Sequence, residues 1–318
     1  MKHRFLTISM LLGVTAFLSG GLSSVAGQSP AARAASFRSV TIATEPNATV
    51  WIDGVRFGKT GPSGSLDIKT VSAGPHTLVV RAGGFKEKKL PITAAQKGVV
   101  TVSLAKTTDE ADLAFQVAER IVGQDREKSA EEYRRAIEAR RNFPEAYIGL
   151  ARVSAEMGEL EEATKAIAAA RRLRPGYAEA SVVEGRIHKD NGEETKAIAA
   201  FKRAISEGKG YQPEAYTGLG LLYKEKAEGF GGAGDFENET ANYAEASKNL
   251  KISLKQLSGA PDSVVIYQLL GLVYERQKKY AEAIATYVEF LRIFPNSSEA
   301  TAVRSFIVQL KKDMAAQD

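Results

Sequence analysis

The side chains that could carry out acid–base or metal chemistry in this sequence are few. The chain has no cysteine, which excludes disulfides and thiolate zinc sites. Its histidines are His3, His76 and His188, and they give neither a serine, histidine and acid arrangement nor a two-histidine metal spacing. We therefore predict that the protein is not an enzyme and has no cofactor or metal site.

Two glycine-rich strings match phosphate-binding loops by their letters. Segment 229–234 satisfies G-x-G-x-x-G, yet a helical pattern precedes it where the dinucleotide motif needs a strand. The acidic segment 235–239 that follows would also repel phosphate. Segment 54–60, GVRFGKT, is one residue short of the phosphate-loop spacing and lies within a strand pattern. We expect no nucleotide ligand at either string.

The first 26 residues have the layout of a secretory signal. Lys2 and Arg4 precede an apolar run at 5–18, and small residues lead to Ala26. As a helix the run would be ~21 Å long, short of the ~30 Å hydrocarbon core. We predict cleavage after residue 26 and export to the periplasm or cell surface, with an uncleaved anchor as the alternative. Loss of these two cations lowers the net charge from +5 to +3, and a mildly basic exported chain gives no support for nucleic-acid binding.

Residues 27–37 are small and polar and predict a linker, after which apolar residues alternate with period two as far as residue 106. Asp53-Gly54, between two such runs, is a strong signal for a two-residue hairpin turn. Six or seven short strands over 38–106 predict a small all-β antiparallel sandwich.

The same residues resemble a known family. The stretches TEPNATVWIDGVRFGKT and AGPHTLVVRAGGFKEKKLPI are similar to the PEGA domain, a β module of mostly bacterial surface and exported proteins. The matching landmarks are Pro46, Ala48, Val50, Asp53-Gly54, Gly58, Thr60, Ala73-Gly74, His76 and Gly84-Phe85. The resemblance implies a fold far more than a biochemical role.

One face of this predicted sandwich carries an aromatic residue. Trp51 points away from the side of Val50 and Ile52, since neighbours in a strand alternate. With Arg56 or Arg81 it could form an aromatic and cationic platform for a glycan or a partner. The alternative, which we favour, is that the ring lies over the sheet or against neighbouring helices.

From residue 110 the period becomes helical, and landmarks recur every 34 residues, as between Ala151 and Gly185 or Ala163 and Ala197. Small residues at these positions would let the two helices of a pair approach closely. The stretches EAYTGLGLLY and IYQLLGLVYERQKKYAEAIATYVEFLRIFP resemble the tetratricopeptide repeat. The resemblance implies an all-α right-handed superhelical array, with a degenerate first pair at 107–143, repeats at 144–297 and a capping helix with a tail at 298–318.

One repeat is interrupted. Tyr223 and Ala246 are 23 residues apart, whereas the equivalent landmarks elsewhere are nine apart, so 14 residues are inserted between two helices. We predict a loop near 227–241. We favour a tolerated insertion over a loop that contacts a ligand.

The repeat resemblance also implies that the first helix of each pair lines a groove that holds peptides or partner helices. Repeat register places eight candidate partner-binding residues there: Arg152, Arg186, Lys189, Leu221, Lys224, Gln268, Leu272 and Arg276. Their composition favours an acidic and apolar partner. We predict a non-enzymatic exported scaffold in the cell envelope. The alternative is an envelope-binding protein whose β module attaches to glycan or cell-wall polymer, with the array as a spacer.

Overall fold

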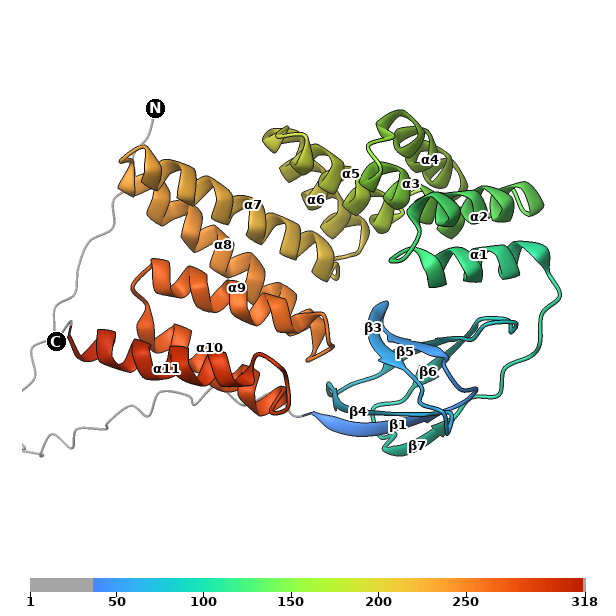
Figure 1. Cartoon of the computed structure of the whole chain (residues 1–318), viewed down its shortest axis with the longest axis horizontal. Helices are drawn as coiled ribbons and strands as arrows, with labels where there is room; N and C mark the ends of the chain where they lie inside the picture. The colour runs from blue at the N-terminus through green and yellow to red at the C-terminus, as the bar shows by residue number, and fades with distance from the viewer. Residues whose placement is uncertain (1–36, 317–318) are drawn as a thin grey trace, which may run out of the picture. The chain divides into compact units, whose positions relative to one another are not determined.

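A computed structural model describes residues 37–316 of the chain. The predicted signal peptide at 1–26 and the linker before residue 37 lie outside the described residues. The N-terminal strands are β1 (Arg38–Ala43), β2 (Thr49–Ile52), β3 (Val55–Lys59), β4 (Ser65–Val71), β5 (His76–Arg81), β6 (Lys88–Ile92) and β7 (Gly98–Thr101). They form two sheets, in the orders β4-β1-β7 and β3-β2-β5-β6, which together make up the β module, residues 38–106 (Figure 1).

The predicted sandwich and hairpin are confirmed. Alternate residues such as Val40 and Leu78 are fully buried, as a two-sheet core requires. Asp53 and Gly54 turn between β2 and β3 with φ of 52° and 82°, the left-handed values of a type I′ turn. One strand pair departs from the antiparallel prediction, because β7 lies parallel to β1. The preceding strand, β6, belongs to the other sheet, so the chain crosses between the sheets before entering beside β1.

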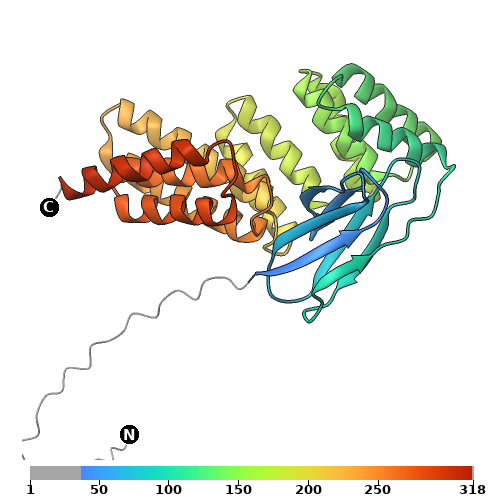
Figure 2. The same cartoon turned by 60° about the horizontal axis from the view of Figure 1, so that its bottom comes forward.

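Eleven helices follow within the described residues: α1 (Glu110–Ile121), α2 (Arg126–Ala139), α3 (Pro144–Glu156), α4 (Leu160–Leu173), α5 (Ala178–Asp190), α6 (Glu194–Glu207), α7 (Pro213–Gly232), α8 (Phe236–Leu257), α9 (Ser263–Arg276), α10 (Tyr280–Ile293) and α11 (Ala300–Ala315). They pack as consecutive pairs, and α11 packs on α10 (Figure 2). Within residues 37–316 no helix combines the length and apolarity that crossing a membrane requires.

Glycine permits the close helix approach predicted within each pair. A Cβ atom at Gly185 of α5 would lie 2.7 Å from the Phe201 ring of α6. A Cβ atom at Gly271 of α9 would lie 2.3 Å from the Tyr287 ring of α10. Both aromatic rings are buried, so the missing methyl group is the space in which the second helix packs.

The insertion near 227–241 is not a loop, so that prediction is wrong. α5 and α6 have 13 and 14 residues, whereas α7 and α8 have 20 and 22, and only 233–235 separate the long pair. Gly229, Gly231 and Gly232 lie inside α7, and Gly234 lies in the short turn that follows it. A Cβ atom at Gly231 would lie 2.7 Å from the carboxyl group of Glu239 in α8, the far end of a flexible side chain that can move aside. The inserted residues therefore lengthen both helices.

An aspartate caps the start of α1. Asp109 is the cap: its carboxylate accepts a hydrogen bond from the backbone N–H of Asp112 at 3.0 Å. The Thr107 hydroxyl instead donates to the Asp112 carboxylate at 3.3 Å. An aspartate at this place serves equally well as an acceptor for the first helical N–H groups.

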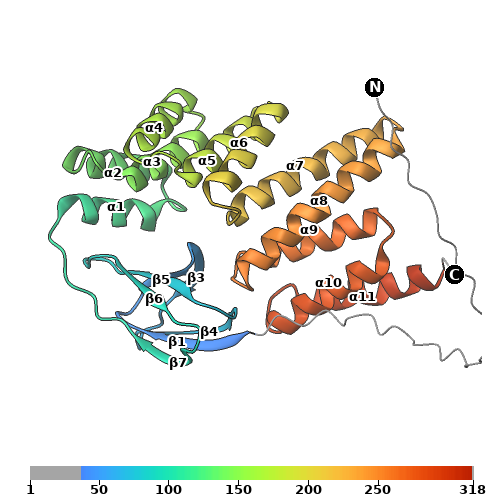
Figure 3. The ribbon, with the colours of Figure 1, turned by 180° about the vertical axis from the view of Figure 1, so that it is seen from behind.

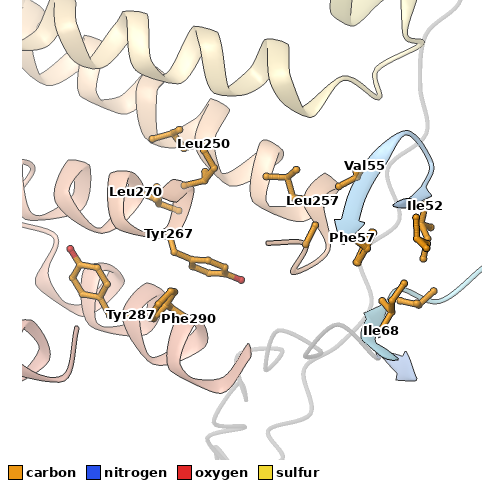
Figure 4. Close-up of a cluster of buried hydrophobic side chains, with 14 of the residues drawn as sticks. Ile52, Val55, Phe57, Ile68, Leu250, Leu257, Tyr267, Leu270, Tyr287 and Phe290 are labelled. Carbon is orange, nitrogen blue, oxygen red and sulfur yellow. The ribbon is translucent and has the colours of Figure 1, made fainter. Parts of the chain in front are cut away.

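The β module and the helical array (α1–α11) form one compact unit. A single apolar core contains buried residues of both, among them Val55 and Ile68 from the strands and Leu257 and Tyr267 from the helices (Figure 4). The core ties the strands to the C-terminal repeats, which are almost 200 residues away in sequence.

Candidate partner-binding face

The first helices of four pairs and the β2–β3 turn surround one cavity of about 520 Å³. We call it the composite cavity, because its walls come from both modules. Its lining residues are Asp53, Gly54, Val55, Arg56, Arg152, Glu179, Tyr211, Gln212, Pro213, Glu214, Thr217, Leu257, Asp262, Val265 and Ile266. Four of the helices that line it, α3, α5, α7 and α9, are the ones that the repeat register assigned to the groove.

Part of the composite cavity is apolar. Val55 and Ile266 are buried in its wall, while Val265 of α9 keeps 52% of its surface exposed. An exposed valine inside a cavity costs solvation free energy until a ligand covers it. This face can therefore bind an apolar side chain from another molecule.

A three-residue ion network lies at the α3 end of the cavity. The carboxylate of Glu214, near the start of α7, accepts hydrogen bonds from Arg152 at 3.0 Å and from Arg186 at 3.2 Å. Burial alone would raise the pKa of Glu214, but the positive charges of the two arginines outweigh it and hold the pKa below its usual value. The charge of Glu214 in turn raises the pKa of Arg152. Two of the three predicted groove arginines, Arg152 and Arg186, are thus already paired with a carboxylate of the array.

The predicted groove lysines are paired as well. Lys189 contacts Glu225 at 3.3 Å, and Lys224 contacts Glu228 at 2.7 Å. Neither lysine lines the composite cavity. The positive charges that the sequence placed on the first helices are therefore paired with carboxylates on the same surface.

The remaining predicted groove residues lie outside the composite cavity. Leu221, Gln268 and Leu272 are half-buried, and Arg276 is exposed. Within residues 37–316, Arg276 makes no ion pair. The structure thus brings only Arg152 of the eight candidates to the cavity wall, and it adds Glu214, Thr217 and Val265.

The proposed aromatic platform faces a helix. The guanidinium carbon of Arg81 lies 4.9 Å from the centre of the Trp51 ring and 4.7 Å from the centre of the Phe115 ring on α1. Arg81 also contacts Glu119 of α1 at 3.5 Å. Trp51 therefore packs through Arg81 against the array, the alternative that we favoured. Arg56 is exposed and lines the composite cavity.

Gln116 of α1, which the sequence did not single out, makes a second contact to the β module. Its side-chain carbonyl accepts a hydrogen bond from the Gly84 N–H at 2.9 Å, and its amide donates to the Phe85 carbonyl at 2.7 Å. One amide thus satisfies two backbone groups of the β module.

The histidines of the described chain are held by neighbouring side chains. His76 lies 2.6 Å from Asp53 through Nδ1 and 2.9 Å from the Ser72 carbonyl through Nε2. His188 lies 2.6 Å from Glu193, the residue before α6. No group of histidine, aspartate or glutamate side chains with metal-binding geometry occurs in residues 37–316.

Comparisons with known families agree with these two modules. Residues 150–213 and 264–297 match tetratricopeptide repeat families, and residues 37–108 match the PEGA domain. The chain therefore carries tetratricopeptide repeats and an N-terminal PEGA domain. These repeats support a role as a protein-interaction scaffold.

Among curated proteins, anaphase-promoting complex subunit 3 of Schizosaccharomyces pombe is 27% identical over 170 residues, which cover 54% of this chain and 23% of that protein. The chain thus spans less than a quarter of that relative's length. Yeast Tom70 is similar in structure, with a TM-score of 0.52 and 17% identity over 65% of this chain and 41% of that one. TTC0263, a tetratricopeptide repeat protein of Thermus thermophilus, has a TM-score of 0.46 and 17% identity over 62% of this chain and 99% of its own. The Tom70 likeness shows a shared helical fold.

Proposed function

We propose that this chain is a non-enzymatic, exported scaffold that binds a protein or peptide partner in the cell envelope through the face formed by α3, α5, α7 and α9. The composite cavity carries the proposal, since it opens on the first helices of four pairs and contains an exposed valine. The presence of repeats found in interaction scaffolds supports the same function.

The partner that fits the cavity is an apolar segment. The arginines on which we based an acidic partner are engaged by Glu214, so an acidic peptide would have to compete with a carboxylate already in place. Val55, Val265 and Ile266 offer an apolar wall instead. Burial of one leucine-sized side chain there contributes about 1.5–3 kcal/mol.

A photo-crosslinking amino acid at Val265 tests this function. Val288 of α10 is the matched control, because it is 51% exposed but does not line the cavity. In cells, we expect a discrete crosslinked protein from position 265 that is missing from position 288. The substitution Thr217→Arg, which fills the cavity, should remove that product. Identical products from the two positions, or a product that survives Thr217→Arg, would contradict the proposal.

The alternative function, attachment to glycan or cell-wall polymer through the β module, rested on a Trp51 platform. That ring now packs on Arg81 and through it on Phe115, so no observation favours this function. Co-sedimentation of the full chain with purified cell-wall sacculi would revive it.

Export is part of the proposal and rests on the N-terminal sequence. N-terminal sequencing of the protein recovered from a periplasmic fraction should begin at Gly27 if the signal is cleaved after Ala26. Recovery only from the cytoplasm would contradict export.

A further inference from the structure

The β module contacts the array at two separated places. Figures 1 and 3, seen from opposite sides, both show β3 between α1 and the C-terminal end of α8. In a repeat array each pair normally contacts only its neighbours. Here the β module joins the first pair to helices that follow more than 100 residues later.

The contact at α1 adjoins the covalent connection between the modules. Besides the Arg81 and Gln116 interactions, the Thr107 N–H donates to the Gly84 carbonyl at 2.9 Å, and the Lys86 N–H donates to the Ala105 carbonyl at 2.8 Å. The connector before α1 is therefore bound to the β module by backbone hydrogen bonds. This side cannot separate far, because the chain itself joins the two parts.

The contact at the end of α8 has a different character. Val55 and Leu257 lie together in the cavity wall (Figure 4). A Cβ atom at Gly259 would lie 3.0 Å from the Thr70 methyl group of β4. We call these four residues the latch. The latch holds the β module to the array by apolar and van der Waals contact, and no covalent connection crosses it.

We propose that the β module is a lid over the composite cavity, which pivots at the α1 connector and opens at the latch. When the latch is closed, the β2–β3 turn forms one wall of the cavity and restricts entry to the face of α7. When the latch opens, the partner segment gains access to Thr217 and Ile266, beyond the already exposed Val265. A partner that binds the open state shifts the equilibrium toward it. This inference depends on the proposed function in one respect, namely which molecule enters the cavity.

The absence of native cysteine allows a test that needs no partner. Thr217→Cys places a single thiol on the cavity wall, and its rate of modification by a bulky maleimide reports access to the cavity. Leu257→Asp puts a charge into the latch and should speed that modification roughly tenfold. A thiol at exposed Ser305 of α11, Ser305→Cys, should react at the same rate with and without Leu257→Asp.

Leu310→Asp is the matched control for loss of stability, because Leu310 is also buried, 3% exposed against 7% for Leu257, but lies in α11. It should leave the Thr217→Cys rate unchanged. If Leu257→Asp lowers helix content by circular dichroism, Val55→Ala tests the other side of the latch and should also raise the rate.

The lid proposal is wrong if the Thr217→Cys thiol reacts at the same rate with and without Leu257→Asp while helix content is retained. The proposal is also wrong if Leu310→Asp raises the modification rate of Thr217→Cys as much as Leu257→Asp does. Both results are independent of the crosslinking experiment at Val265. A responsive thiol without a crosslinked partner would refute the scaffold function and leave the lid standing.

Discussion

At the scale of single residues, the glycines of the paired helices divide into two physical classes. An added Cβ at Gly271 would collide with the buried Tyr287 ring, whereas a Cβ at Gly229 would meet nothing within 4 Å. We expect Gly271→Ala to lower the free energy of unfolding by about 1–3 kcal/mol, because the packed ring must move. Gly229→Ala, in the helical extension, should raise it by about 0.5–1 kcal/mol. Urea unfolding of the two variants measures the change in unfolding free energy of each. Two changes of the same sign would contradict the division of the glycines into two classes.

A buried serine and an arginine make Glu162 sensitive to acid. The hydrogen bond from Arg134, and then that from Ser154, lower the pKa of Glu162 from 4.5 to about 2. A lowered folded-state pKa contributes stability that is present above the unfolded value and is lost as pH falls through the folded value. Glu162→Gln should therefore flatten the loss of stability between pH 5 and pH 2. Parallel curves of unfolding free energy against pH for the two proteins would show the prediction to be wrong.

At the scale of the element, the caps of the long pair and of the following helix differ. The Asp235 carboxylate accepts a hydrogen bond from the Asn238 N–H at 3.1 Å, whereas Asp262, before α9, makes no side-chain cap bond. Loss of an aspartate cap costs about 1 kcal/mol of helix stability. Asp235→Ala should thus speed hydrogen exchange in the first turn of α8 about fivefold. Asp262→Ala should leave the first turn of α9 unchanged, and equal effects would contradict the difference in capping.

The sequence predicted the elements well where local pattern decides them. The 34-residue spacing between Ala151 and Gly185 identified the helix pairs, and Asp53-Gly54 identified the hairpin. The pattern failed at 227–241, because four glycines there suggested a loop by composition. Glycine is tolerated inside a helix as well as in a loop, so the composition of this segment does not distinguish the two structures.

At the scale of the whole molecule, contacts between distant residues limited what the sequence could show of the site. Repeat register placed Arg152 and Arg186 on one face, yet their partner Glu214 comes from a different pair. The β module contributes Val55 and Arg56 to the same cavity, and no periodicity in the strands indicates which helices they meet. Such contacts depend on how two modules dock, which local patterns do not encode.

The same docking predicts how the molecule unfolds. The single tryptophan, Trp51, lies in the β module, so its fluorescence follows the strands, while circular dichroism at helical wavelengths follows the array. Because the modules share one core, the two signals should change together during urea unfolding. Gln116→Ala leaves the Gly84 N–H and the Phe85 carbonyl without their side-chain partner and should weaken the contact by about 2 kcal/mol.

The fluorescence transition of Gln116→Ala should therefore move to lower urea and separate from the helical transition, since the β module can then unfold while the array persists. Gln309→Ala is the matched control: this exposed glutamine of α11 donates only to Asp313 at 2.7 Å, far along the chain from the strands. Its two transitions should stay coincident. If both signals of Gln116→Ala shift by the same amount, the amide stabilises the molecule as a whole and does not set the coupling between the modules.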